Sequence, residues 1–83
     1  MKLGIYSVKD TKIGYMQPFY QNNEAVAVRN FSNAINSPQL NNINQNLEDM
    51  ELWQLGTFDD QTGEITSEIK FVIKAIDLKK ETK

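Results

Sequence analysis

The C-terminal half of the chain carries two alternating apolar segments around a turn signal, and this pattern limits the fold more than any other feature. Residues 50–58 and residues 65–76 both show the period-two alternation of half-buried strands. The five residues between 59 and 63, Asp-Asp-Gln-Thr-Gly, supply an aspartate to open a turn and a glycine for a left-handed conformation. The sequence therefore predicts an antiparallel hairpin.

Side-chain alternation assigns the two faces of this hairpin. In the first strand, Met50, Leu52 and Phe58 are expected on one face, and Trp53 and Leu55 on the other. In the second strand, polar residues alternate with an apolar set, which predicts that Lys70 and Lys74 share one face; the apolar set is Ile65, Ile69, Phe71, Ile73 and Ala75. A helix that buries Ile69, Val72, Ile73 and Ile76 is the alternative for this segment.

The N-terminal part predicts two further extended segments. Residues 2–9 form a strand with apolar groups on both faces, Leu3 and Ile5 on one side and Tyr6 and Val8 on the other. After a turn at residues 10–12, residues 14–20 form a second extended segment. Because Pro18 has no N–H group to donate to a ladder, that part is expected to be an edge or irregular.

One segment has helical periodicity instead. Asn22 and Asn23 are suitable N-caps, and Glu24 is favourable in a first helical turn. The dipeptide at residues 37–38, Ser-Pro, should end the helix, because the residue before a proline avoids the α conformation. The predicted buried face consists of Ala27, Val28, Phe31, Ala34 and Ile35.

These elements predict a small α+β domain of order ββαββ, with one mainly antiparallel four-stranded sheet covered by a single helix. The domain is expected to span residues 1–77, with a long loop over residues 38–48 that holds at most a short helical turn. Residues 78–83 are expected to form a flexible basic tail. A single helix covers only one sheet face, and homodimerisation through the other face or through an edge strand would hide it.

The chain contains neither cysteine nor histidine. Their absence excludes disulfides, thiolate metal sites and cysteine nucleophiles, and it removes the commonest general base. The four glycines are scattered, so no phosphate-binding loop is indicated. We therefore expect a protein that is not an enzyme and has no cofactor or metal. No apolar run suits a signal peptide or a membrane span, so a cytoplasmic location is expected.

Charge is segregated along the chain. Residues 37–68 carry seven acidic side chains and no lysine or arginine, whereas basic residues outnumber acidic ones in residues 1–36 and 69–83. The net charge of −2 argues against a generic nucleic-acid binder. Two kinds of binding surface therefore stay open, one basic and aromatic, the other acidic.

The basic and aromatic residues suit single-stranded nucleic acid, because bases stack on rings while lysine and arginine neutralise phosphates. The expected phosphate contacts are Lys2, Lys9, Lys12, Arg29, Lys70 and Lys74, and the expected stacking rings are Tyr6 and Tyr20. In the alternative, the acidic region 48–68 binds another protein without direct DNA contact, through Asp59, Asp60 and Glu64. A purely structural turn also explains these three carboxylates.

Three segments occur in an order that resembles a known family. They are residues 1–10 (Met-Lys-Leu-Gly-Ile-Tyr-Ser-Val-Lys-Asp), residues 17–20 with 27–31 (Gln-Pro-Phe-Tyr and Ala-Val-Arg-Asn-Phe), and residues 52–63 (Leu-Trp-Gln-Leu-Gly-Thr-Phe-Asp-Asp-Gln-Thr-Gly). This pattern resembles the small non-structural protein of gokushovirus-type microviruses, which are bacteriophages with single-stranded DNA genomes.

The resemblance implies a role in viral DNA replication, in single-stranded DNA synthesis or its switch to packaging. It implies binding to single-stranded DNA, to the phage replication initiator or to a host replication protein. The implied location is the cytoplasm of the infected bacterial host. For the alternative acidic surface, the resemblance implies that the partner is a host or phage protein. The resemblance brings no catalytic residues with it.

Overall fold

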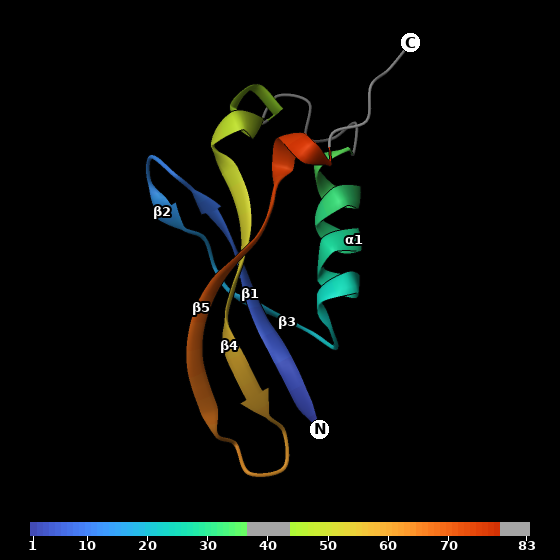
Figure 1. Cartoon of the computed structure of the whole chain (residues 1–83), viewed down its shortest axis with the longest axis vertical. Coiled ribbons are helices and arrows are strands. Elements are labelled where there is room, and N and C mark those ends of the chain that lie inside the picture. Colours follow the sequence, from blue (N-terminus) through green and yellow to red (C-terminus); the bar gives the residue numbers. More distant parts are fainter. Residues whose placement is uncertain (37–43, 79–83) are drawn as a thin grey trace.

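The computed structural model describes residues 1–36 and 44–78, which form one antiparallel sheet and one α-helix (Figure 1). The strands are β1 (Lys2–Asp10), β2 (Gly14–Tyr15), β3 (Phe19–Gln21), β4 (Met50–Asp59) and β5 (Ile65–Lys74), and the helix is α1 (Glu24–Ile35). Two 3₁₀ helices, Asn44–Asp49 and Ala75–Asp77, precede β4 and follow β5. The predicted α+β class is confirmed. Of the predicted loop at 38–48, residues 38–43 lie outside the described residues, and residues 44–48 belong to the first 3₁₀ helix.

The sheet has the order β2-β1-β4-β5, and β3 also pairs with β1. The expected extended segment at 14–20 is divided into two short strands, so the sheet has five strands instead of four. Lys9 lies opposite Tyr15 of β2, and Tyr6 lies opposite Phe19 of β3. The division falls at residues 16–18, where Pro18 has no N–H group for the ladder.

The helix begins and ends as its sequence predicts. The Asn23 side chain caps α1, since its Oδ1 accepts a hydrogen bond of 2.9 Å from the Val26 N–H group. Ala27, Phe31 and Ile35 are buried at a spacing of four residues. The prediction for Ala34 was wrong, because the buried stripe centres on Phe31 and Ile35 and leaves Ala34 exposed at its margin.

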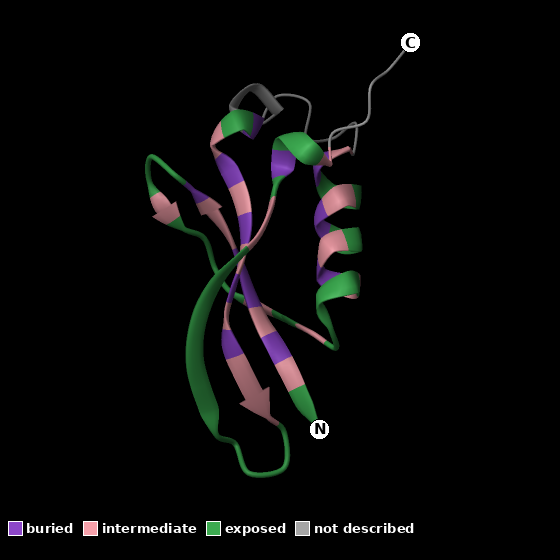
Figure 2. Cartoon of the chain, viewed as in Figure 1, coloured by how far each residue is buried: buried purple, intermediate pink, exposed green. Residues whose placement is uncertain are grey.

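The core lies between α1 and one face of the sheet, which we call the covered face. Tyr6 and Leu52 are fully buried there, and Val8 packs against them (Figure 2). Leu78, which was expected in the tail, also packs against this core, and its carbonyl accepts a 3.1 Å hydrogen bond from Asn36 Nδ2. Residues 79–83, the rest of the predicted tail, lie outside the described residues.

A bulge in β4 changes the face of Phe58. Ile5 lies opposite Gly56 while Tyr6 lies opposite Gln54, so Leu55 is an extra residue relative to β1. Phe58 consequently lies opposite Leu3, on the face away from Leu52. The predicted grouping of Phe58 with Leu52 was wrong, because simple alternation takes no account of the extra residue.

A second bulge in β5 changes the faces of Ile73 and Lys74. Trp53 lies opposite Phe71 and Leu52 lies opposite Ile73, so Val72 is the extra residue. Ile73 therefore packs toward the covered face. β5 ends at Lys74, and the buried Ala75 begins a 3₁₀ turn instead of extending the predicted strand to residue 76.

Candidate nucleic-acid interface

The sheet face opposite α1, which we call the open face, carries a row of three aromatic rings. Tyr15 of β2, Trp53 of β4 and Phe71 of β5 form this aromatic row. The ring centroids of Tyr15 and Trp53 are 6.1 Å apart at an interplanar angle of 85°, and those of Trp53 and Phe71 are 5.7 Å apart at 75°. Both contacts are edge-to-face, the favourable geometry for aromatic pairs. The row thus crosses the sheet as one connected band.

A small residue on β1 allows this row to form. Ser7 lies opposite Trp53 and is completely buried. Its hydroxyl donates a 2.6 Å hydrogen bond to the carbonyl of Met16, which follows Tyr15 directly. Ser7 therefore holds the end of β2 against β1, and its short side chain leaves room for the Tyr15 ring to reach Trp53 across the intervening strand.

A lysine and a glutamate accompany the row. The Lys9 Nζ atom lies 5.3 Å from the Tyr15 ring centroid and 4.8 Å from that of Trp53, within cation–π range. Glu51 Oε1 accepts a 2.8 Å hydrogen bond from Trp53 Nε1, which fixes the indole. Lys9 and Lys74 lie opposite Glu51 on its two sides. Two positive side chains therefore flank the row on the open face.

The outer rings of the row are accessible. Tyr15 is 44% exposed and Phe71 is 46% exposed. Stacking of a base on an aromatic ring contributes about 1–3 kcal/mol and tolerates any base, because every base has a π-face. The row with its lysines therefore has the components of a platform for single-stranded nucleic acid.

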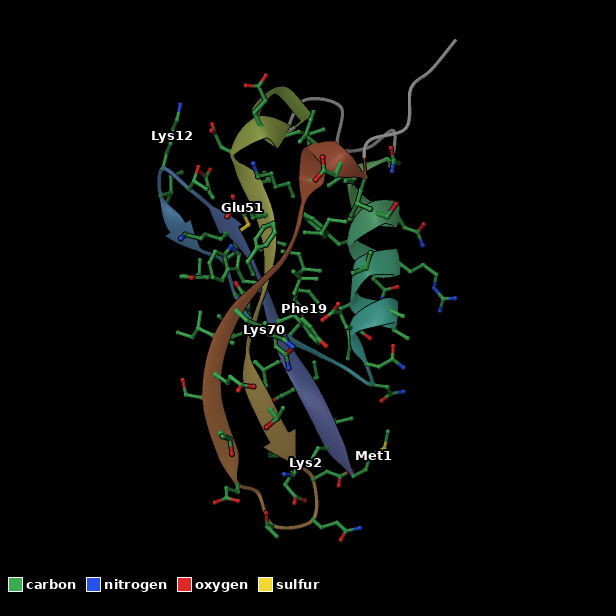
Figure 3. All side chains as sticks on the ribbon, in the orientation of Figure 1. Met1, Lys2, Lys12, Phe19, Glu51 and Lys70 are labelled. Carbon is green, nitrogen blue, oxygen red and sulfur yellow. The ribbon has the colours of Figure 1, made fainter. Side chains whose placement is uncertain are left out.

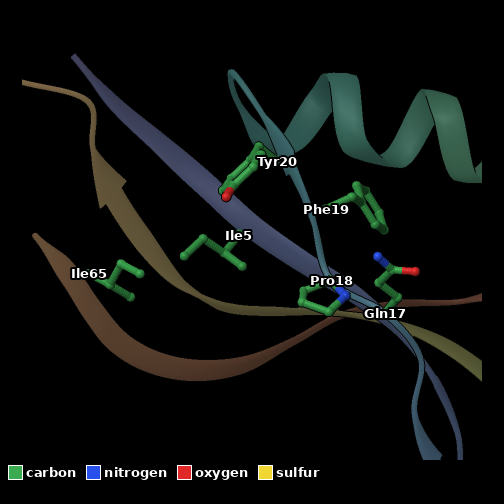
Figure 4. Close-up of a pocket in the computed structure, with 6 residues that line it drawn as sticks. All are labelled: Ile5, Gln17, Pro18, Phe19, Tyr20 and Ile65. Carbon is green, nitrogen blue, oxygen red and sulfur yellow. The ribbon is translucent and has the colours of Figure 1, made fainter. Parts of the chain in front are cut away.

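A second aromatic group lies on the same face, nearer the hairpin turn. The Tyr20 ring is 61% exposed, and its centroid lies 5.7 Å from that of Phe58. Beside it is a pocket of about 340 Å³ (Figure 4), lined by Ile5, Gln17, Pro18, Phe19, Tyr20 and Ile65. Tyr20 lies opposite Ile5, which places its exposed ring on the open face.

Of the two predicted stacking rings, Tyr20 is available and Tyr6 is not. Tyr6 is only 2% exposed and its ring stacks on Phe19 at 6.2 Å inside the core. Burial raises the pKa of the Tyr6 hydroxyl above its ordinary value, and the negative charge of Glu24 adds to the shift. Alternation turns the Tyr6 ring toward α1, so the structure does not offer it to a ligand on the open face.

The predicted basic residues do not form one surface. Lys2 and Lys12 lie toward opposite ends of the molecule (Figure 3), and the Lys12 Nζ atom is 3.5 Å from Asp49 Oδ2. Arg29 is exposed on α1. Lys70 lies opposite Gln54, on the same side as Tyr6. Among the six predicted phosphate contacts, Lys9 and Lys74 are the two that lie beside the aromatic row.

The prediction that Lys70 and Lys74 share one face was wrong. Lys70 is opposite Gln54 and Lys74 is opposite Glu51, and these two β4 residues face opposite ways. The extra residue, Val72, shifts the alternation between the two lysines. Of these two lysines, Lys74 is therefore the one that lies on the same face as Lys9.

The acidic residues of the alternative surface, Asp59, Asp60 and Glu64, lie in or beside the hairpin turn, and Asp59 stabilises it. Asp59 Oδ1 accepts a 2.9 Å hydrogen bond from the Gln61 N–H group, and Gly63 has a positive φ of 79°. Hydrogen bonds from the Gln61 and Thr62 backbones hold the pKa of the Asp59 carboxyl below its usual range.

The other two residues of that surface lie beside the same turn. Asp60 Oδ1 is 3.0 Å from the N-terminal amine of Met1, and the Glu64 backbone carbonyl accepts from the Asp59 N–H group. Glu48 and Asp49 lie at the other end of β4, so the acidic region does not gather into one patch.

Sequence reasoning missed Tyr15, Trp53 and Phe71 as stacking rings. The alternation did place Trp53 on the face away from Leu52, and that placement was correct. The proximity of the three rings depends on the pairing of β1 with β2 and β4, however, and on the register at Val72. The one signal for this aromatic row in the sequence was the predicted position of Trp53, on the strand face away from the core residue Leu52.

Over residues 1–36 and 44–78, no group of three acidic side chains is arranged to hold a metal ion, and no helix is long and apolar enough to cross a membrane.

Comparison with known proteins identifies a family. Neither the curated proteins nor the solved structures contain a match to this chain. The family model described as Phage ORF5 protein matches residues 3–78. The chain therefore belongs to the Phage ORF5 protein family.

Proposed function

We propose that this phage protein binds single-stranded DNA on its open face and acts in viral DNA replication without catalysing a reaction itself. The observation that carries the proposal is the aromatic row of Tyr15, Trp53 and Phe71, with the Lys9 ammonium held within 5.3 Å of two of its rings. Half-exposed rings beside positive charges combine base stacking with phosphate neutralisation.

The charge of the protein determines what kind of binding to expect. Within residues 1–36 and 44–78, Lys9 and Lys74 are the two basic residues that flank the row, and the net charge of the chain is −2. Neutralising two phosphates of a single strand gives a salt slope of about −1.4 in a plot of log affinity against log salt concentration. Binding should therefore depend mainly on stacking, and it should tolerate any base sequence.

The proposed setting follows from the resemblance to the gokushovirus non-structural protein. The protein would act in the cytoplasm of an infected bacterium, during single-stranded DNA synthesis or its switch to packaging. The phage replication initiator or a host replication protein would be a second partner at the same DNA. The membership in a phage protein family supports the phage setting.

Fluorescence offers a direct test because Trp53 is the single tryptophan of the chain. Titration with an unlabelled oligothymidylate at low salt should change the Trp53 emission, and anisotropy of a labelled oligonucleotide gives the affinity. Replacement of a ring that stacks on a base should weaken binding about 5- to 150-fold, the equivalent of about 1–3 kcal/mol. Tyr15→Leu should show this loss, and Tyr15→Phe, which keeps the ring, should not.

Two matched charge variants complete the test. Lys74→Gln should reduce the magnitude of the salt slope by about 0.7, since it removes one phosphate contact. Arg29→Gln removes the same charge from the exposed surface of α1 and should leave slope and affinity unchanged. Absence of binding at tens of micromolar protein, or equal affinity of Tyr15→Leu and the unmodified protein, would refute the proposal.

A further inference from the structure

The strand β5 forms one edge of the sheet in the described part of the chain. It is ten residues long, and β4 is its only neighbour within the described part of the chain. The seven residues from Ile65 to Phe71 are all exposed (Figure 2), with Ile65 at 66% and Ile69 at 58%. A long exposed edge with apolar side chains is a template for pairing with another strand.

Charges on this edge favour one pairing partner and one register. Glu68 and Lys70 flank Ile69, and neither side chain makes an ion pair with any other described residue. In an antiparallel pair of two identical strands, centring the pair on Ile69 sets Glu68 opposite Lys70 of the second copy, and Lys70 opposite Glu68. Opposite charges directly across a strand pair are stabilising.

We infer that β5 pairs antiparallel with β5 of a second copy of this chain, with Ile69 opposite its own counterpart on a two-fold axis. The same register sets the small Ser67 opposite the large Phe71 of the second copy. Moving the axis to Glu68 or to Lys70 would set like charges directly opposite one another, which is destabilising. The register of β5 against β4 shifts at Val72 and again between Lys70 and Ser67, where Glu68 and Ile69 have no partner residue in β4. The pairing with the second copy is centred on Ile69, one of these two residues, and spans residues 67–71.

This pairing has a consequence for the whole assembly. A two-fold axis perpendicular to the sheet keeps both copies' open faces on the same side, because residue 69 then lies opposite residue 69. Two aromatic rows would share one continuous sheet surface. The inference itself does not depend on DNA binding, since it rests on the edge and charges of β5 alone.

Cysteine cross-linking tests the register. The chain has no cysteine, so Ile69→Cys introduces a single thiol that can form a disulfide only with a second copy. Residues directly opposite in an antiparallel pair have Cα atoms about 4.5–5.5 Å apart, within the range that a disulfide spans. Ile65→Cys is the matched control. It is an exposed isoleucine on the same strand and face, but its counterpart would be about 26 Å away, eight residues along the strand.

Mild oxidation at micromolar protein, without DNA, should convert Ile69→Cys to a covalent dimer and leave Ile65→Cys monomeric on a non-reducing gel. Circular dichroism of both variants checks that they are folded. Equal cross-linking of the two, or none of either, would overturn the inference.

Charge exchange provides an independent measurement. By sedimentation equilibrium, Glu68→Lys should raise the dimer dissociation constant several-fold, because it sets two lysines opposite each other. Glu68→Lys combined with Lys70→Glu restores opposite charges at both pairs and should restore the dimer. Failure of the double variant to recover would contradict this register, whatever the result of the DNA titrations.

Discussion

Lys70 and Lys74 lie four residues apart on β5 and yet face opposite sides of the sheet, Lys70 opposite Gln54 and Lys74 opposite Glu51. The extra residue Val72 is the cause. It also allows Ile73 to lie opposite Leu52 on the covered face while Phe71 meets Trp53 in the aromatic row. This one extra residue therefore places Ile73 on the covered face and Phe71 on the open face.

Deletion of Val72 should destabilise the protein more than Val72→Ala does. Deletion shifts the alternation and turns either Ile73 away from Leu52 or Phe71 away from Trp53. Full burial of an isoleucine contributes about 1.5–3 kcal/mol, so loss of the partly buried Ile73 contact should cost up to that amount, whereas truncation of the half-buried Val72 should cost about 1 kcal/mol. Urea unfolding of the two variants measures the difference. Equal midpoints would show that the bulge has no structural role.

Gly56→Ala should weaken the pairing of β4 with β5. A Cβ atom at this position would meet the backbone carbonyl of Thr66, which has little freedom to move within the sheet. We expect a loss of about 1–3 kcal/mol in the free energy of unfolding.

Gly63→Ala is the control for Gly56→Ala. Gly63 has a φ of 79° but open space around the added Cβ atom. Gly63→Ala should lower the free energy of unfolding by about 1–2 kcal/mol, the cost of holding an alanine in the left-handed conformation. If Gly56→Ala retains full stability in urea unfolding, the close approach of β4 and β5 at this position is not required.

Stability should decrease at alkaline pH because of Tyr6. Its pKa is raised in the folded state, mainly by burial, so the unfolded chain loses the hydroxyl proton at a lower pH than the folded protein. The folded state then holds more protons, and the free energy of unfolding falls as pH rises past the ordinary tyrosine value of about 10.

Tyr6→Phe isolates this effect, since it keeps the ring and removes the titrating hydroxyl. Urea unfolding between about pH 9 and pH 11 should show a steeper loss for the unmodified protein than for the variant. Parallel pH profiles would mean that Tyr6 titrates equally in both states.

Asn23→Ala should shorten or weaken α1. The Asn23 Oδ1 atom accepts a 2.9 Å hydrogen bond from Val26 N, and loss of such a cap costs about 0.5–2 kcal/mol. Asn23→Asp keeps the acceptor and should retain stability. Asn22→Ala, one residue outside the cap, should change stability by less than about 0.5 kcal/mol. A thermal melt that shows equal losses for Asn22→Ala and Asn23→Ala would contradict the assignment of the cap.

Features that depend on neighbouring residues were predictable from the sequence. The cap at Asn23, the stripe of Ala27 and Phe31, and the turn that ends at Gly63 all use hydrogen bonds or periodicity within a few residues. These local interactions form in the same way in almost any tertiary context, and the helix and the hairpin were therefore found at their observed positions.

The candidate site was less predictable. Lys9 and Tyr20 were identified, but Tyr6 proved to be buried, and Tyr15, Trp53 and Phe71 were missed as a group. These three rings come from strands separated by up to 56 positions in the chain, and only the pairing of β1 with β2 and β4 brings them together.

The sequence by itself determined the α+β class, the single helix, the hairpin and the absence of cysteine and histidine chemistry, because composition and short-range periodicity suffice for these. Only the tertiary structure decided which side chains share a face. The extra residues Leu55 and Val72 exchange the two sheet faces for the side chains that follow them in each strand. Nothing in the local sequence pattern identifies either residue as a bulge. The open face, with its aromatic row and two lysines, exists because of these register shifts and the long-range pairing around β1.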